Sequence, residues 1–143
     1  MSAQPSLIRR LGMAKGLGFV IGLTAFFAIS QHWPEESIWL RIGICLWYTT
    51  FGAFIGIAGI INFHPLLKVP LPFWFRGIFF GGWLNLVLAL LMYEKLQLML
   101  GSLNGPFNSP FWIVSEGMAI GLVIDGICTW FGGEGRQVLA DAP

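Results

Sequence analysis

The sequence predicts an all-α fold, a polytopic membrane four-helix bundle in which the helices run up-down-up-down and residues 1–143 form a single transmembrane domain. Composition is the first observation that predicts it: 56% of the residues are hydrophobic and only 10% are charged, whereas soluble domains carry about 25% charged residues. The second is the presence of four apolar stretches, each long enough for a helix to cross the ~30 Å hydrocarbon layer. The third is that every connection between them is too short to hold a soluble domain.

The four predicted membrane-spanning helices cover residues 12–30, 38–63, 73–98 and 112–131. In the last of them, Trp112 and Trp130 lie 130 − 112 = 18 positions apart. At 1.5 Å per residue this separates the two indoles by about 27 Å, which is close to the hydrocarbon thickness.

Breaks in the apolar pattern separate the predicted helices. The polar segment 31–37 ends in Glu36 and Ser37, either of which could cap the second helix. The segment 63–72 contains three prolines, which cannot continue a helix. The segment 101–110 has turn-forming residues and no charge.

Basic residues gather on one side of the predicted bundle, and they predict its orientation. They are Arg9, Arg10, Lys15, Lys68, Arg76 and Arg136. The two connections on the other side, 31–37 and 101–110, contain no lysine or arginine. By the positive-inside rule we expect both termini in the cytoplasm, so the protein is N-in and C-in in the inner (plasma) membrane of a bacterium.

The first 30 residues allow one other interpretation. The Arg9-Arg10 pair, the apolar run after it and Ala28-Ile29-Ser30 resemble the three regions of a secretory signal peptide. Cleavage after Ser30 would leave three helices and move the new N-terminus to the other side. The distribution of basic residues already fits four spans, so we expect the segment to remain as the first helix.

Glycines spaced by four residues indicate how the helices pack. In lipid, helices associate through close backbone approach and polar contacts, because hiding apolar side chains gains nothing. The glycines that we expect in packing faces are Gly18, Gly22, Gly52, Gly56, Gly117 and Gly121. One further turn along the fourth helix brings Asp125 onto the face of Gly117 and Gly121, toward a neighbouring helix. A ligand cavity is the alternative use of these small residues.

Two acids in the fourth helix, Glu116 and Asp125, are candidates for the functional site. They are nine residues apart, so they face opposite sides of the helix and cannot act as a catalytic carboxylate pair. An unpaired charge at the bilayer centre costs about 2.5–3.5 kcal/mol, so each acid needs a partner. Cations at a similar depth in the membrane are the candidate partners. By this criterion we expect Arg41 to pair with Glu116, and Arg76 or Lys15 to pair with Asp125.

A proton- or ion-coupled site is the functional alternative to these structural pairs, since carboxylates inside a membrane often mark such sites. Asn85 in the third helix, with Thr49 and Thr50 in the second, could add oxygen ligands near the midplane. The segment 70–76 holds three consecutive aromatic residues and Arg76. It is either an anchor near lipid phosphates or a docking segment for a partner subunit.

No catalytic motif, cofactor motif or metal-binding spacing stands out, so we expect no enzyme, no cofactor and no metal. The net charge of +1 and the lack of a basic stripe argue against nucleic acid as a partner. The expected function is a non-catalytic helical subunit or accessory protein, in contact with lipid and with other subunits or copies of itself. The alternative is a small oligomeric ion- or proton-coupled transporter or channel that uses Glu116 or Asp125.

Overall fold

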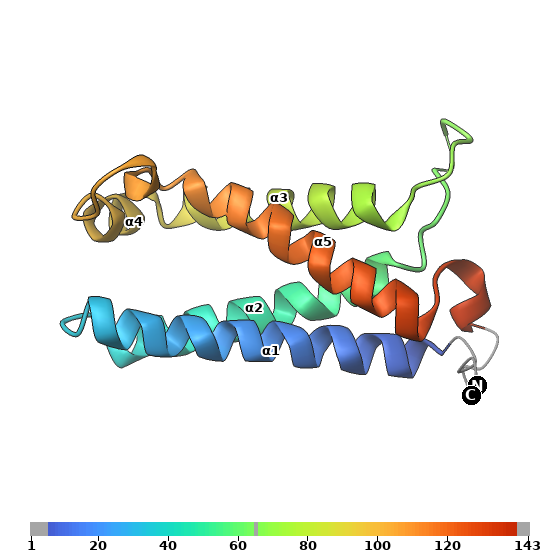
Figure 1. Cartoon of the computed structure of the whole chain (residues 1–143), viewed down its shortest axis with the longest axis horizontal. Coiled ribbons are helices and arrows are strands. Elements are labelled where there is room, and N and C mark those ends of the chain that lie inside the picture. Colours follow the sequence, from blue (N-terminus) through green and yellow to red (C-terminus); the bar gives the residue numbers. More distant parts are fainter. Residues whose placement is uncertain (1–5, 65, 140–143) are drawn as a thin grey trace.

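Four long helices are arranged as two pairs in the computed structural model, which describes residues 6–64 and 66–139 (Figure 1). Helix α1 (Leu7–His32) packs along α2 (Ile38–Ala58), and α3 (Phe73–Leu91) packs along α5 (Trp112–Gly132). All four are long and apolar enough to cross a membrane. The described residues contain no strand, so the fold is all-helical as predicted.

Three short elements complete the described chain: α4 (Tyr93–Leu100) and the 3₁₀ helices η1 (Pro106–Asn108) and η2 (Gly135–Leu139). We refer to the end of the bundle where α1 begins and α5 ends as the terminal end, and to the end that carries α4 as the far end (Figure 1). Helix α5 crosses obliquely, beginning beside α3 and ending beside α1, so the two pairs meet at the terminal end.

Side-chain caps set the starts of the first two helices. Ser37 Oγ accepts a hydrogen bond from the backbone N–H of Leu40 at 3.2 Å, which makes Ser37 the N-cap of α2. Ser6 caps α1 in the same way through the N–H of Arg9, at 3.5 Å. Helix α1 therefore begins at Leu7, earlier than the predicted residue 12, and its first turns include Arg10.

The second helix ends at Ala58 rather than at residue 63, which corrects the sequence-based boundary. The backbone after Ala58 bonds to other segments instead of continuing the helix. The carbonyl of Gly59 accepts from the N–H of Gly135 at 2.9 Å, and the carbonyl of Asn62 accepts from the N–H of Leu71 at 2.9 Å. These bonds draw the 59–72 connection back on itself and hold η2 against it.

The predicted helix 73–98 is two helices, α3 and α4, which break at Met92 (φ −114°, ψ 23°). Helix α4 turns away from the α3 direction at the far end (Figure 1) and buries Leu96 and Met99. Two contacts hold it there: the indole N–H of Trp33 donates to the carbonyl of Met99 at 3.0 Å, and Lys95 Nζ lies 2.6 Å from Glu36 Oε2. The amphipathic pattern of α4 was hidden within one long apolar stretch.

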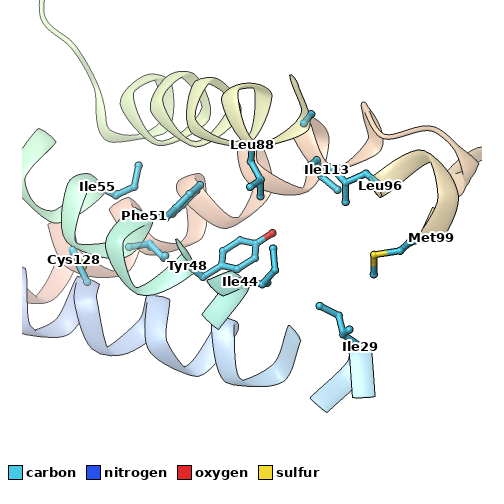
Figure 2. Packing of buried hydrophobic residues seen from close by; sticks show 13 residues of the cluster. Ile29, Ile44, Tyr48, Phe51, Ile55, Leu88, Leu96, Met99, Ile113 and Cys128 are labelled. Atoms are coloured by element: carbon cyan, nitrogen blue, oxygen red, sulfur yellow. The ribbon is translucent and has the colours of Figure 1, made fainter. Parts of the chain in front are cut away.

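Apolar side chains from all five α-helices fill the space between the two pairs (Figure 2). Phe51 and Ile55 of α2, with Ile124 and Cys128 of α5, are almost fully buried toward the terminal end. Ile29, Leu96 and Met99 close the far end. A groove opens beside these three residues at the far end.

Candidate functional site

Glycines bring the backbones of each helix pair into direct contact. A Cβ built on Gly18 would lie 2.2 Å from the carbonyl oxygen of Tyr48, and one on Gly52 would lie 2.2 Å from that of Ala14. Real Cβ atoms do not approach so closely, so these positions in α1 and α2 accept only glycine without a shift of the helices. A Cβ on Gly22 would lie 2.5 Å from the carbonyl oxygen of Cys45 in α2, and one on Gly56 would lie 2.8 Å from the Cβ of Ala14 in α1.

Helices α3 and α5 also meet along a row of glycines, which we call their glycine seam. A Cβ on Gly121 would lie 2.1 Å from the carbonyl oxygen of Gly77, and one on Gly81 would lie 2.1 Å from that of Gly117. Sequence reasoning placed Gly117 and Gly121 in a packing face but overlooked Gly77 and Gly81. Their spacing of four residues was the signal that could have found them.

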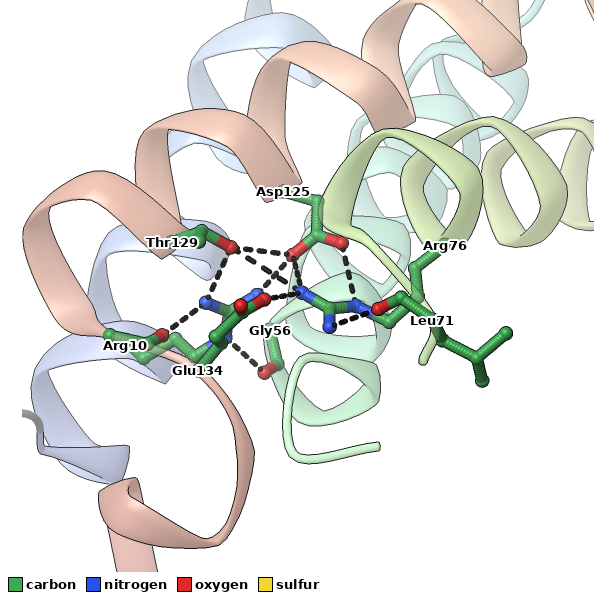
Figure 3. Close-up of polar contacts among 8 residues, drawn as sticks. Arg10, Gly56, Leu71, Arg76, Asp125, Thr129 and Glu134 are labelled. Atoms are coloured by element: carbon green, nitrogen blue, oxygen red, sulfur yellow. Dashed lines mark hydrogen bonds and ion pairs between the residues drawn. The ribbon is translucent and has the colours of Figure 1, made fainter. Parts of the chain in front are cut away.

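Asp125 lies fully buried at the terminal end, among charged residues from α1, α3 and the segment after α5 (Figure 3). Arg10 and Arg76 are buried as well, whereas the side chain of Glu134 is 40% exposed. Arg10 of α1 forms an ion pair with Asp125 Oδ1, and the Nε of Arg76, on α3, lies 3.1 Å from Asp125 Oδ2. Glu134, just after α5, accepts from Arg76 at 2.8 Å. We refer to Arg10, Arg76, Asp125 and Glu134 as the arginine–aspartate cluster.

The remaining donors of the two guanidinium groups are also bonded. Arg10 donates through Nε to the carbonyl of Gly56 at 3.0 Å and to Thr129 Oγ1 at 3.2 Å. Arg76 donates to the carbonyl of Leu71 at 3.0 Å. Two cations and two carboxylates give the cluster a net charge of zero, so burial does not leave a charge uncompensated. The ion pairs of the cluster join α1, α3 and α5, and a hydrogen bond connects it to α2.

The structure brings Asp125 together with Arg76, one of the two partners considered for it, and not with Lys15, which is exposed. Arg10 takes the second position, although sequence reasoning treated it as a residue preceding the first helix. Arg10 precedes Ala14 by four residues and Gly18 by eight, so the three residues share one face of the helix. This spacing could have identified Arg10 as a residue that faces the bundle. Arg76 is 1% exposed, so its side chain points into the bundle and not toward lipid phosphates.

Glu116 and Arg41, the other predicted pair, are not brought together. Arg41 donates to the carbonyls of Pro34 and Glu36 at 2.8 and 2.9 Å, which holds it against the connection before α2. The pairing predicted from equal depth is wrong because two side chains at the same height can point in different directions around their helices. Among the described residues Glu116 forms no ion pair.

Glu116 instead lines a groove of about 390 Å³ between the two helix pairs. Helices α1 to α5 all contribute to its wall, which is apolar apart from a few groups, among them the Tyr48 hydroxyl beside the Glu116 carboxyl. We refer to it as the Glu116 groove. Its main apolar lining residues are Ile21, Ile29, Ile44, Leu88, Leu96, Met99, Leu100 and Ile113, most of which Figure 2 shows.

Asn85 joins three helices beside this groove. Its Nδ2 donates to the carbonyl of Ile113 at 2.8 Å and to the Tyr48 hydroxyl at 3.4 Å. Its Oδ1 accepts from the indole N–H of Trp47 at 3.2 Å. The amide that sequence reasoning considered as an ion ligand is therefore fully buried and engaged in protein contacts.

No group of three histidine, cysteine or acidic side chains in residues 6–64 and 66–139 could hold a metal ion. Comparison of the chain with known protein families, curated proteins and solved structures found no match. The geometry of the two regions, the arginine–aspartate cluster and the Glu116 groove, must therefore carry any functional interpretation.

Proposed function

We propose that this protein is a non-catalytic helical subunit or accessory protein of a complex in a bacterial inner membrane. The four apolar helices indicate a membrane protein; the rest of this assignment is an inference. In the proposed arrangement the long helices alternate in direction and both termini are cytoplasmic, which puts the arginine–aspartate cluster near the cytoplasmic face. The basic residues on that side, among them Lys68 and Arg136, support this orientation.

The arginine–aspartate cluster is the observation that carries the proposal. An acid that moves protons or ions must exchange its partner during a cycle, whereas Asp125 is fully buried and bonded to two arginines at once. Such a network favours a structural use, in which the charge joins three helices into a rigid unit. A rigid unit of this kind is suited to packing against other membrane helices.

A row of stacked rings on α3 is the surface that we propose for a partner subunit. The Phe75 and Phe79 rings stack with centroids 6.0 Å apart, and Phe79 stacks on Trp83 at 6.5 Å. All three are exposed, and aromatic residues are enriched in the cores of protein interfaces.

Photo-cross-linking tests this proposal directly. A photoreactive residue at Phe79 is expected to capture one defined polypeptide or a second copy of the chain in native membranes. The same residue at Phe27, on the exposed face of α1, serves as the control and is expected to capture lipid. Capture of lipid alone from both positions, with an isolated monomer recovered in mild detergent, would contradict the subunit proposal.

A small oligomeric ion- or proton-coupled transporter remains the second candidate, and one observation favours it. Glu116 stands in the Glu116 groove without an ion partner among the described residues, as an exchanging carboxylate must. Asp125 does not fit this role. Loss of proton-linked flux in Glu116→Gln, at normal abundance of folded protein, would support the transporter over the subunit.

A further inference from the structure

We propose that the Glu116 groove binds a lipophilic amine, a small molecule with an apolar body and one cationic ammonium group that pairs with Glu116. The inference goes beyond the proposed function, because a ligand site in the groove does not depend on the identity of any partner subunit. It rests on the charges around Glu116, the volume of the groove and the depth of Glu116 along α5.

The charge of the ligand follows from the surroundings of Glu116. The polar group beside it, the Tyr48 hydroxyl, is neutral and accepts a hydrogen bond from the neutral Asn85 amide. Lys95 at the same end is paired with Glu36, and Arg41 is held by backbone carbonyls. A lone carboxylate in hydrocarbon is costly, so a cation entering the groove gains an interaction that no described side chain supplies.

The size of the ligand follows from the volume of about 390 Å³. Ligand pockets span about 300–1,000 Å³, so the groove is at the small end of that range. One turn of a helix 10 Å across and 5.4 Å long occupies about 420 Å³, so the groove cannot take up a transmembrane helix. A molecule the size of one or two fused rings fits.

The depth of Glu116 argues against a lipid headgroup as the source of the ammonium. Glu116 is four residues further along α5 than Trp112, which is about 6 Å deeper at 1.5 Å per residue. Tryptophans such as Trp112 mark the headgroup level. The ammonium of a lipid would have to leave that level, whereas a free amine can enter with its rings among Ile44, Leu88 and Met99.

The test compares 1-naphthylmethylamine with 1-naphthylmethanol, which has nearly the same shape and no charge. Binding of each is measured by titration calorimetry to the full chain in nanodiscs of phosphatidylcholine and phosphatidylglycerol, with empty nanodiscs subtracted. We expect saturable binding of one amine per chain, at least about tenfold tighter than binding of the alcohol. Equal affinities, or no saturable binding, would overturn the proposal.

Two pairs of variants locate the site. Glu116→Gln is expected to remove the preference for the amine, while Glu94→Gln, on α4 outside the groove, keeps it. Ala28→Phe fills the groove and is expected to weaken the binding of both probes at least tenfold. Ala119→Phe, on an exposed face of α5 outside the groove, leaves both unchanged. If Glu116→Gln fails to fold, the Ala28 and Ala119 pair still decides the matter.

Two results would assign the groove to another occupant. If phosphatidylethanolamine added to the nanodiscs displaces the amine stoichiometrically, the ammonium comes from lipid and the proposal is wrong. If the amine binds only after a co-purified polypeptide is removed, and a lysine or arginine of that polypeptide cross-links to the position of Glu116, the natural cation is a side chain. That outcome also overturns the proposal, even though it supports the subunit function.

Discussion

The two ends of the bundle place an acid of the same helix in opposite surroundings. At the terminal end Asp125 is fully buried, and two arginines and Thr129 surround it. At the far end Glu116, on the same helix, opens into a groove and has no ion partner among residues 6–64 and 66–139. The difference teaches that the presence of an acid in a membrane helix does not define its use. The use of the acid is defined by the charges and the empty space around it.

The largest effect that should separate the two ends is the loss of the Asp125 charge. Asp125→Asn leaves the buried Arg10 without a carboxylate and Arg76 with Glu134 alone, which costs about 3–5 kcal/mol of unfolding free energy. We expect Glu116→Gln, the matched change at the far end, to lower stability by less than about 0.5 kcal/mol, because it breaks no ion pair among the described residues. Titration of unfolding with dodecyl sulfate in micelles, followed by circular dichroism, measures both. Equal losses would refute the contrast between the ends.

A smaller effect is expected at the backbone contact that positions Asp125. In Gly121→Ala the added methyl group meets the carbonyl of Gly77, and separating the helices should cost about 1–3 kcal/mol. Gly16→Ala is the control, because nothing lies within 4 Å of a Cβ at that position. There the gain in helix propensity should stabilise the protein by about 0.5–1 kcal/mol. A loss of stability in Gly121→Ala and a gain in Gly16→Ala, measured in the same unfolding assay, would confirm that Gly121 lies at a close backbone contact.

Asn85 tests whether the far end is held by neutral hydrogen bonds. Asn85→Leu removes its bonds to Ile113, Tyr48 and Trp47, and interhelical bonds of this kind average about 0.6 kcal/mol each, so we expect a loss of about 1–2 kcal/mol. Thr49→Val is the control, since Thr49 bonds only within its own helix. Comparable thermal stability of the two variants in detergent would show that Asn85 does not hold the far end.

The smallest effect concerns the partly exposed ion pair between Lys95 and Glu36, which attaches α4 to the connection before α2. A double-mutant cycle with Lys95→Ala and Glu36→Ala should give a coupling of about 0.2–1 kcal/mol, falling as salt rises. The Arg10–Asp125 pair, being buried, should respond little to salt over the same range. A coupling that salt does not change would mean that the far end is as closed as the terminal end.

Much of the architecture was predictable because a membrane constrains it strongly. The four apolar stretches and the glycine faces follow from helix length and periodicity, and the partnership of Asp125 with Arg76 followed from their matched depths. These arguments require only positions along helices. The break at Met92 and the early end of α2 depend instead on contacts with residues distant in the chain, which apolarity does not reveal.

The candidate sites show the same limit. Arg10 was missed because its role depends on where α1 starts, and that is decided by the Ser6 cap and not by hydropathy. The Glu116–Arg41 pair was wrong because rotation about the helix axis and the carbonyls before α2 determine where Arg41 points. The Glu116 groove arises from the oblique course of α5 and the position of α4. Neither is encoded in a local pattern.

The span of chain that the arginine–aspartate cluster closes has a consequence for biosynthesis. Arg10 and Asp125 are 115 residues apart, so a ribosome adding about 5–20 residues per second completes the acid about 6–23 s after the base. During that interval Arg10 can reach the carbonyl of Gly56 but lacks the carboxylate that balances its charge. We therefore expect the first turn of α1 to reach its final position only when α5 packs against it, which would make the arrival of α5 the step that completes assembly.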